Sequence, residues 1–165
     1  MLFRSSPVDP TVTILAGTIR VRGVSLQTQG HITPSWTAMA GYTFLDAEIT
    51  SSPNKDAGQR PQNTPRNALR LFSSYDVTPQ FTVGGEADYT SSRVPASVPD
   101  GNGLHQEVPG YWVASALARY QLTAHAQLQL NVDNLFDEHF YDGLDDNHVN
   151  VGAGRSVHLG LSVQG

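Results

Sequence analysis

Three groups of residues in this sequence could do chemistry, and the first is an acidic run near the C-terminus. It consists of Asp142, Asp145, Asp146, Asn147 and His148. Hard cations bind clustered carboxylate oxygens, so this run could form a cation site. It lacks the spacing of an EF-hand loop, and a solvated acidic loop fits the same residues. We favour the solvated loop and expect no metal site.

The second and third groups are a glycine-rich segment and the histidines. Residues 152–156 superficially resemble a phosphate-binding loop, but they lack its Gly-x-x-x-x-Gly-Lys spacing and open a strand instead of a helix. The 6 histidines show no metal-ligand spacing. Composition alone leaves a Ser-His-Asp triad open, yet no Gly-x-Ser-x-Gly motif is present. The absence of cysteine excludes thiolate metal sites and cysteine nucleophiles. We therefore expect neither an enzyme nor a cofactor.

The elements that position these residues must form from an unusual composition. The 165 residues are 39% hydrophobic and only 15% charged, whereas typical soluble chains have about 45–50% and about 25%. Such a deficit fits either a disordered polar chain or a β-protein whose strands alternate between two environments. The net charge of −5 and the single lysine, Lys55, leave no basic stripe for phosphates. Nucleic acid is therefore excluded as a partner.

A two-residue period decides between these two classes. Between residues 126 and 133, apolar side chains from Ala126 to Val132 alternate strictly with polar ones from Gln127 to Asp133. Similar alternation predicts about seven strands, over residues 17–30, 35–48, 66–76, 81–90, 111–122, 126–133 and 156–163. No apolar run reaches the roughly 18 residues that a membrane-spanning helix needs. The predicted fold class is therefore all-β.

The connections between the predicted strands alternate in length. Short turns are expected at residues 31–36, 76–81 and 122–125, and two of them contain a Thr-Pro pair. Long polar loops are expected at about 48–65, 91–109 and 137–154. Short turns at one end, long loops at the other and strands of about ten residues are typical of an antiparallel transmembrane β-barrel of the outer membrane. A soluble antiparallel sandwich is the alternative.

Side chains on the predicted strands fit the membrane barrel. A membrane-interface aromatic girdle would lie beside the short turns, and the aromatic residues found there are Trp36, Tyr75, Phe81 and Tyr120. The charged residues of the polar strand faces are Glu86, Asp88, Arg119 and Asp133. A wet lumen would keep these residues hydrated while the backbone groups pair between strands.

Residues 131–142 carry a more specific pattern. This segment resembles the penultimate-strand motif of TonB-dependent outer-membrane receptors, an Asn-x-x-Asn-Leu-Phe-Asp run followed by a basic residue and aromatics. Its motif residues here are Asn131, Asn134, Leu135, Phe136, Asp137 and Tyr141. Glu138-His139 departs from the basic position. Segments 41–48, 63–66, 108–111 and 152–157 resemble the same family in the right order, the last with Gly154 and Arg155. The resemblance covers the chain from about Thr18 onward.

The resemblance implies active uptake of ferric siderophores across the bacterial outer membrane, with catecholate siderophores as the suggested type. It implies a 22-stranded barrel with an N-terminal plug, driven by an inner-membrane energy-coupling complex. Residues 1–165 would then be the C-terminal portion of that barrel, without plug, energy-coupling box or signal peptide, and not transport-competent alone. Family members typically end in an aromatic residue that the barrel-assembly machinery reads, and this chain ends in Gln164-Gly165.

For such a receptor, arginines and aromatic residues are the candidate ligand contacts, because ferric catecholates are anionic and aromatic. The candidates in or beside the predicted long loops are Arg60, Arg66, Arg93, Arg155, Tyr111 and Trp112. The arginines could equally pair with loop carboxylates or with lipopolysaccharide phosphates at the membrane surface. A different function also stays open, namely a free-standing small outer-membrane barrel or adhesin-like surface protein. Barrel closure distinguishes the receptor part from the free-standing barrel. A single-chain barrel must close on itself, whereas an open sheet without the rest of a receptor would aggregate.

Overall fold

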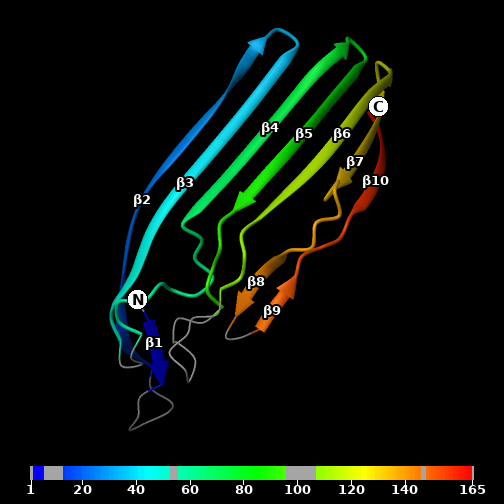
Figure 1. The fold of residues 1–165 in the computed structure, drawn as a ribbon. Coiled ribbons are helices and arrows are strands. Elements are labelled where there is room, and N and C mark those ends of the chain that lie inside the picture. The colour runs from blue at the N-terminus through cyan, green and yellow to red at the C-terminus, as the bar shows by residue number, and fades with distance from the viewer. Residues whose placement is uncertain (1, 6–12, 53–55, 96–106, 146–147, 165) are drawn as a thin grey trace.

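The computed structural model describes residues 2–5, 13–52, 56–95, 107–145 and 148–164. The strands are β1 (Leu2–Ser5), β2 (Thr13–Thr33), β3 (Trp36–Ser51), β4 (Asn67–Thr78), β5 (Phe81–Thr90), β6 (Tyr111–Thr123), β7 (Ala126–Asp133), β8 (Tyr141–Asp145), β9 (His148–Val151) and β10 (Ser156–Val163). Eight of them form one antiparallel sheet in the order β1-β2-β3-β4-β5-β6-β7-β10, and β8 pairs with β9 alone (Figure 1). Within these residues, no helix is long and apolar enough to cross a membrane.

The seven predicted strands are all present as β2 to β7 and β10, but the predicted strand count was too low. The strands β1, β8 and β9 were missed. The hairpin β8–β9 lies inside the segment 137–154, which was predicted as a loop. Its sequence is short, acidic and interrupted by Gly143, so it lacks the alternation on which the prediction depended. The strand β2 is also longer than predicted, with 21 residues.

The short turns lie together at one end of the sheet, as predicted, and the longer connections lie at the other (Figure 1). Threonine side chains stabilise two of the turns. The hydroxyl oxygen of Thr78 accepts the backbone N–H of Phe81 at 3.0 Å, and that of Thr123 accepts the N–H of His125 at 3.2 Å. These local bonds replace the ladder bonds that end at the turn.

The strand register places apolar and polar side chains on opposite faces of the sheet. Leu130 of β7 stands between Ala118 of β6 and Leu159 of β10 on the apolar face. On the polar face, Nε of Arg70 in β4 donates to Oδ1 of Asp88 in β5 at 2.7 Å. Glu86, Arg119 and Asp133 share this polar face. The alternation read from the sequence is therefore confirmed.

Aromatic residues border the apolar face at both ends. At the short-turn end Trp36 pairs with Tyr75, and Phe81 pairs with Tyr120. Eight residues further along β6, Trp112 pairs with Tyr89, and their ring centroids lie 5.0 Å apart. Eight residues span about 27 Å along a strand, or about 20 Å along the axis of a barrel whose strands tilt by roughly 40°. The face therefore has the height of a membrane-embedded band, with aromatic residues at both borders.

Most buried residues lie at the loop-bearing end, because a single sheet has no layer to cover its middle. Ile49 near the end of β3 is 1% exposed, and Val94, Val108 and Leu144 are also buried there. Side chains near the sheet edges are well exposed: Leu26 of β2, beyond the residues that pair with β1, and Leu159 of β10 are 63% and 69% exposed. Within the described residues, β10 pairs only with β7. In the part of the chain that the structure describes, the sheet therefore does not close on itself, and its buried core lies at the loop-bearing end.

Candidate functional site

The connections that follow β3, β5 and β7 meet at the loop-bearing end of the sheet, and Arg93 lies at their junction. Its backbone N–H donates to the Val108 carbonyl at 3.0 Å, and the Val108 N–H donates back to the Arg93 carbonyl at 2.8 Å. This pair of bonds ties the two limbs of the β5–β6 connection together. Arg93 itself is only 5% exposed. Its side chain therefore points into the loops and away from solvent.

The guanidinium of Arg93 contacts two other connections. Its Nη1 donates to Oδ1 of Asn63 at 2.8 Å and to the backbone carbonyl of Asp142 at 2.9 Å, and Nη2 donates to the carbonyl of Tyr141. Asn63 has a left-handed backbone (φ 51°) and donates its N–H to Val94 at 3.0 Å. Asparagine tolerates that conformation better than most residues. One side chain thus joins the β3–β4, β5–β6 and β7–β10 connections.

Two aromatic rings complete this junction. Arg93 lies over the ring of Tyr111, with 5.6 Å between its guanidinium carbon and the ring centroid. The Tyr111 ring in turn lies 4.6 Å from that of Phe140. Gly152 fits against Phe140 so closely that an added Cβ would stand 2.2 Å from the ring. A glycine is therefore needed at 152 for the ring to lie there.

Arg60 is held by a separate set of contacts in the same region. Its Nη2 donates to the carbonyls of Thr64 at 3.2 Å and Ser92 at 3.0 Å. Its Nη1 lies 3.7 Å from Oε1 of Glu107, which also accepts the Ser92 hydroxyl at 2.5 Å. Arg60 and Glu107 border a hollow of about 200 Å³. The sequence reading missed Ser92 and Glu107, because neither belongs to a recognisable motif.

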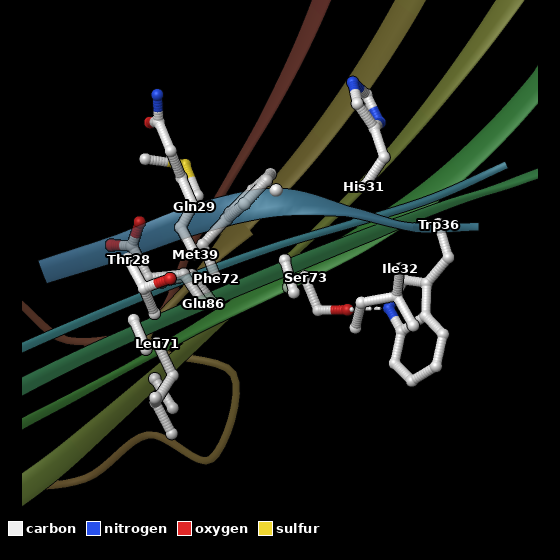
Figure 2. A pocket seen from close by; sticks show the side chains of 16 residues that line it. Thr28, Gln29, His31, Ile32, Trp36, Met39, Leu71, Phe72, Ser73 and Glu86 are labelled. Carbon is white, nitrogen blue, oxygen red and sulfur yellow. Dashed lines mark hydrogen bonds between the residues drawn. The ribbon is translucent and has the colours of Figure 1, made fainter. Parts of the chain in front are cut away.

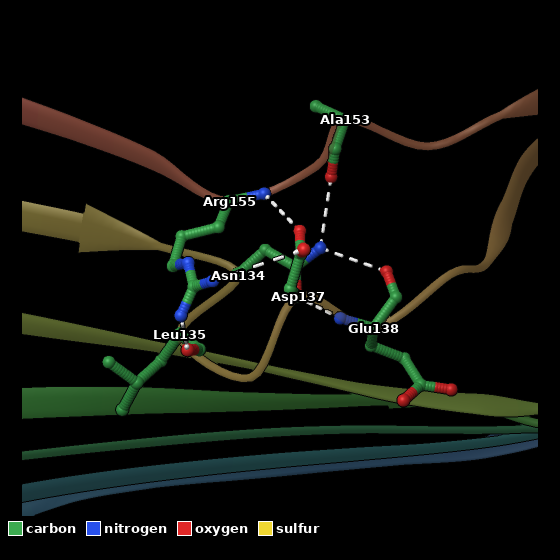
Figure 3. Close-up of polar contacts among 6 residues, drawn as sticks. All are labelled: Asn134, Leu135, Asp137, Glu138, Ala153 and Arg155. Atoms are coloured by element: carbon green, nitrogen blue, oxygen red, sulfur yellow. Dashed lines mark hydrogen bonds and ion pairs between the residues drawn. The ribbon is translucent and has the colours of Figure 1, made fainter.

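The Asn-Leu-Phe-Asp segment, residues 134–137, forms a compact turn directly after β7 (Figure 3). Asn134 is 3% exposed. Its amide nitrogen donates to the carbonyls of Glu138 at 2.9 Å and Ala153 at 3.0 Å, and its amide oxygen accepts the Glu138 N–H at 2.8 Å. Asn134 and Asp137 both have left-handed backbones, with φ of 48° and 55°. The motif is therefore a structural turn at the end of β7, and its bond to Ala153 holds the segment before β10 beside it.

Asp137 and Arg155 close this turn. Oδ1 of Asp137 accepts the backbone N–H of Arg155 at 2.9 Å, and Oδ2 lies 4.0 Å from the Arg155 guanidinium. The backbone donor, helped by the nearby positive charge of Arg155, lowers the pKa of Asp137 below its ordinary value. Leu135 donates its N–H to Ala114 of β6 at 2.7 Å, which anchors the turn to the sheet.

The remaining predicted residues lie apart from this junction. Arg66 is exposed just before β4, and its carbonyl accepts the Leu45 N–H at 2.8 Å. Trp112 faces the opposite side of the sheet from Tyr111, beside Tyr89. Asn131 accepts a hydrogen bond from Gln129 on the polar face, and Phe136 is 76% exposed. Of the six candidate ligand residues, the structure brings only Arg93 and Tyr111 into contact.

Below the junction, the polar face of the sheet carries a hollow of about 500 Å³. The Arg70–Asp88 pair lines it from the sheet, and Tyr111, Phe140 and Asp142 line it from the loop side. A second hollow, of about 690 Å³, lies nearer the short turns, where Figure 2 shows Trp36 and Leu71 on one side of the strands and Gln29 and His31 on the other. None of the candidate arginines lines this second hollow. The first hollow is therefore the one that the loops cover.

The structure also places the groups that the sequence raised as chemical alternatives. The described residues contain no cluster of His, Cys, Asp or Glu that could hold a metal ion, but Asp146 and Asn147 lie outside them. Ser156 and His158 of β10 lie near Asp133, with 3.1 Å from the Ser156 hydroxyl to Nε2 of His158. The same Nε2 lies 3.4 Å from Asp133. A triad needs the two ring nitrogens to contact different partners, so this arrangement does not form one.

Comparisons with known proteins agree with the fold. The family model described as "TonB dependent receptor-like, beta-barrel" matches residues 2–135. The probable TonB-dependent receptor BfrD of Bordetella pertussis is 37% identical over 152 residues, which are 87% of this chain and 20% of that protein. The probable TonB-dependent siderophore receptor PiuA of Acinetobacter baumannii is 34% identical over 167 residues, 94% of this chain and 22% of that protein.

Solved structures give the same result. The siderophore receptor PiuA from Acinetobacter baumannii superposes with a TM-score of 0.79 at 30% identity, over 98% of this chain and 24% of that one. The ferric-catecholate import receptor Fiu from Escherichia coli, in its closed form, has a TM-score of 0.77 at 29% identity, over 98% and 23%. The chain spans about a fifth of the length of the curated relatives it matches. This chain belongs to the family of TonB-dependent receptor β-barrels of the outer membrane.

Proposed function

We propose that this chain is a C-terminal part of the barrel of a receptor that takes up ferric siderophores across the outer membrane. The observation that carries the proposal is the match of 98% of the chain to the siderophore receptor PiuA. The open edges of the sheet support it, because among the described residues β10 pairs only with β7 and β2 beyond Gly17 pairs only with β3, which leaves backbone groups that further strands would pair. A free-standing barrel would instead need its edge strands to pair with each other.

The proposed protein is a carrier and performs no covalent chemistry. In the complete receptor, the polar face of the sheet would line the lumen around the plug, and an inner-membrane complex would supply energy through the N-terminal region. The barrel-assembly machinery would insert the barrel, with lipopolysaccharide and outer-membrane lipid around its apolar face. The 22-stranded barrel, the plug and these partners are parts of the proposal, because the chain covers only a fifth of its relatives.

A ferric catecholate is the proposed substrate class. The name of the relative Fiu includes catecholate import, and anionic aromatic chelates suit arginine and aromatic contacts. Ligand contact by Arg60, Arg66, Arg93, Arg155, Tyr111 and Trp112 stays a prediction. Arg66 and Arg155 are both exposed, but Arg155 lies beside Asp137, and Arg60 and Arg93 are engaged by neighbouring loops. Arg66 is therefore the arginine chosen for the test.

Uptake of radioactive iron tests this proposal. Cells that lack the complete gene are complemented with the native gene or with an Arg66→Ala variant, and given the ferric complex of 2,3-dihydroxybenzoate. We expect uptake only with the gene present, and a rise of about tenfold in the half-saturating concentration with Arg66→Ala, since a hydrogen bond to a charged group contributes about 1.5 kcal/mol or more. Arg22→Ala, at an exposed arginine of β2, is the matched control. Equal uptake with and without the gene would contradict the proposal.

A further inference from the structure

We propose that Arg93 is a positioning residue that latches the β8–β9 hairpin to the neighbouring loops and so fixes the shape of the loop-bearing end of the receptor. The proposal rests on the proposed function, because the shape of that end affects uptake only if the ligand enters there. It gives Arg93 a role in which its side chain need not touch the ligand, consistent with an exposed fraction of 5%.

The hairpin depends on side-chain contacts for its position. Within the described residues, β8 pairs only with β9 and no strand ladder joins them to the main sheet. Arg93 connects the hairpin to the loops through the carbonyls of Tyr141 and Asp142, and Leu144 of β8 is buried at the same end of the sheet. At the hairpin's base, Phe140 lies against Tyr111. Because Arg93 donates to two successive backbone carbonyls, it fixes the backbone of β8 whatever side chains β8 carries.

Arginine is suited to this task and lysine is not. The contacts use three acceptors in different directions, namely one side-chain amide and two carbonyls. The planar guanidinium carries five donors in a rigid fork and stacks on an aromatic ring, as Arg93 does on Tyr111. A lysine ammonium is a single point of charge that could not reach all three acceptors from one position.

The charge of Arg93 makes the latch two-state. Among the described residues, no carboxylate lies within 4.0 Å of its guanidinium, and its buried Nε has no acceptor. The three neutral acceptors therefore provide all of the described hydrogen bonds of the guanidinium. Moving the hairpin away would remove two of these acceptors together and leave a buried charge under-solvated. We expect the hairpin either to be fully latched or to release Arg93 into water, with little population between.

A distance measurement in the complete receptor tests the latch without any ligand. Nitroxide labels are placed at Asn150→Cys in β9 and at Ala57→Cys in the β3–β4 connection, both exposed positions. These 165 residues contain no cysteine, and any cysteine elsewhere in the complete receptor is replaced by serine. Electron–electron double resonance in outer membranes should give one narrow distance for the native residue. We expect Arg93→Gln and Arg93→Lys to give a broad distribution, while Tyr111→Phe, which keeps the ring, and Arg22→Gln keep the narrow one. An unchanged distribution with Arg93→Gln would overturn the proposal.

The Asn63→Gly variant keeps the test decisive if Arg93→Gln fails to reach the outer membrane. Glycine accepts the left-handed backbone at this position, and the variant retains the arginine while removing one of its three acceptors, so we expect partial broadening. A native distribution in Asn63→Gly would then overturn the latch.

Uptake of the ferric complex of 2,3-dihydroxybenzoate supplies the second readout. Arg93→Gln should raise the half-saturating concentration by about three- to tenfold, because the loops must then be ordered during binding. The maximal rate should stay within about twofold of the native rate, since no transport step uses Arg93. A fall in maximal rate alone would contradict a positioning role. If the native receptor takes up none of this complex, the proposed function fails, while the label distances still decide the latch.

Discussion

The backbone N–H of Arg155 donates to Oδ1 of Asp137 at 2.9 Å, which joins the turn after β7 to the residue before β10. Asp137 can present this oxygen because its backbone is left-handed, with φ of 55°. The bond fixes the point at which the chain returns to the sheet just before β10. Leu135 of the same turn is bonded to Ala114 on β6. The contact therefore fixes the position at which β10 starts relative to β6 and β7.

The acid response of this turn should depend on Asp137. Its pKa is lowered by the Arg155 N–H, so its stabilising effect is present above the unfolded-state pKa of about 4. That effect is lost as the pH falls through the lower folded-state pKa. We expect the unfolding temperature, measured as the loss on heating of the band of folded protein in gel electrophoresis, to decrease when the pH is lowered below about 4. The Asp137→Asn variant should lack this component, and an identical acid response in both proteins would argue against it.

Asn134→Ala should be among the most destabilising substitutions in this region. It removes three hydrogen bonds from a buried position and places alanine at φ of 48°. We expect a loss of about 3 kcal/mol, measured by urea unfolding in lipid vesicles. Asn134→Gly relieves the backbone strain but not the lost bonds, so its loss should be smaller. Equal losses in the two variants would mean that the backbone conformation contributes nothing.

Two glycines of the same segment should respond differently to alanine. At Gly152, the new Cβ would overlap the Phe140 ring and push it off Tyr111. At Gly154, the nearest atom to such a Cβ is Oδ1 of Asp137 at 3.4 Å, an ordinary contact. Gly152→Ala should cost about 1–3 kcal/mol and Gly154→Ala less than about 1 kcal/mol. Proteolysis of the β8–β9 hairpin provides the readout, and equal sensitivity of the variants would contradict the packing described.

A charge placed on neighbouring residues of β6 should distinguish its two faces. Ala116 lies midway between Trp112 and Tyr120 on the apolar face, and Ser115 pairs with Glu86 on the polar face. Ala116→Arg should cost about 2–4 kcal/mol, as at a bilayer midplane. Ser115→Arg gains a nearby carboxylate and should cost less than about 1 kcal/mol. The amount of folded receptor in outer membranes measures the difference, and the reverse order would mean that the faces are assigned wrongly.

The sheet could be predicted from the sequence because lipid and lumen impose a strict two-residue period. Residues 126–133 show that alternation completely, and β7 covers the same residues. The hairpin β8–β9 could not be predicted in this way, because it has no apolar face in a membrane. Its position depends on Arg93 and on the Tyr111–Phe140 contact, which join residues far apart in the chain.

The candidate site shows the same division. The Asn-Leu-Phe-Asp motif is readable because local backbone geometry demands particular residues, such as Asn134 with its left-handed backbone. The role of an arginine is not readable locally. Arg66 and Arg93 look alike in sequence, yet one is exposed and the other is 5% exposed and held by three acceptors. Only the contacts between loops separate the two.

The central claim is that this chain is part of a larger siderophore receptor, and the mass of the native polypeptide tests it most directly. An antibody raised against residues 137–154 is used on outer membranes from iron-starved and iron-replete cells. The account predicts one band far above the 17.8 kDa of this chain, stronger on iron starvation. A membrane band at 17.8 kDa would contradict it and support a small independent barrel.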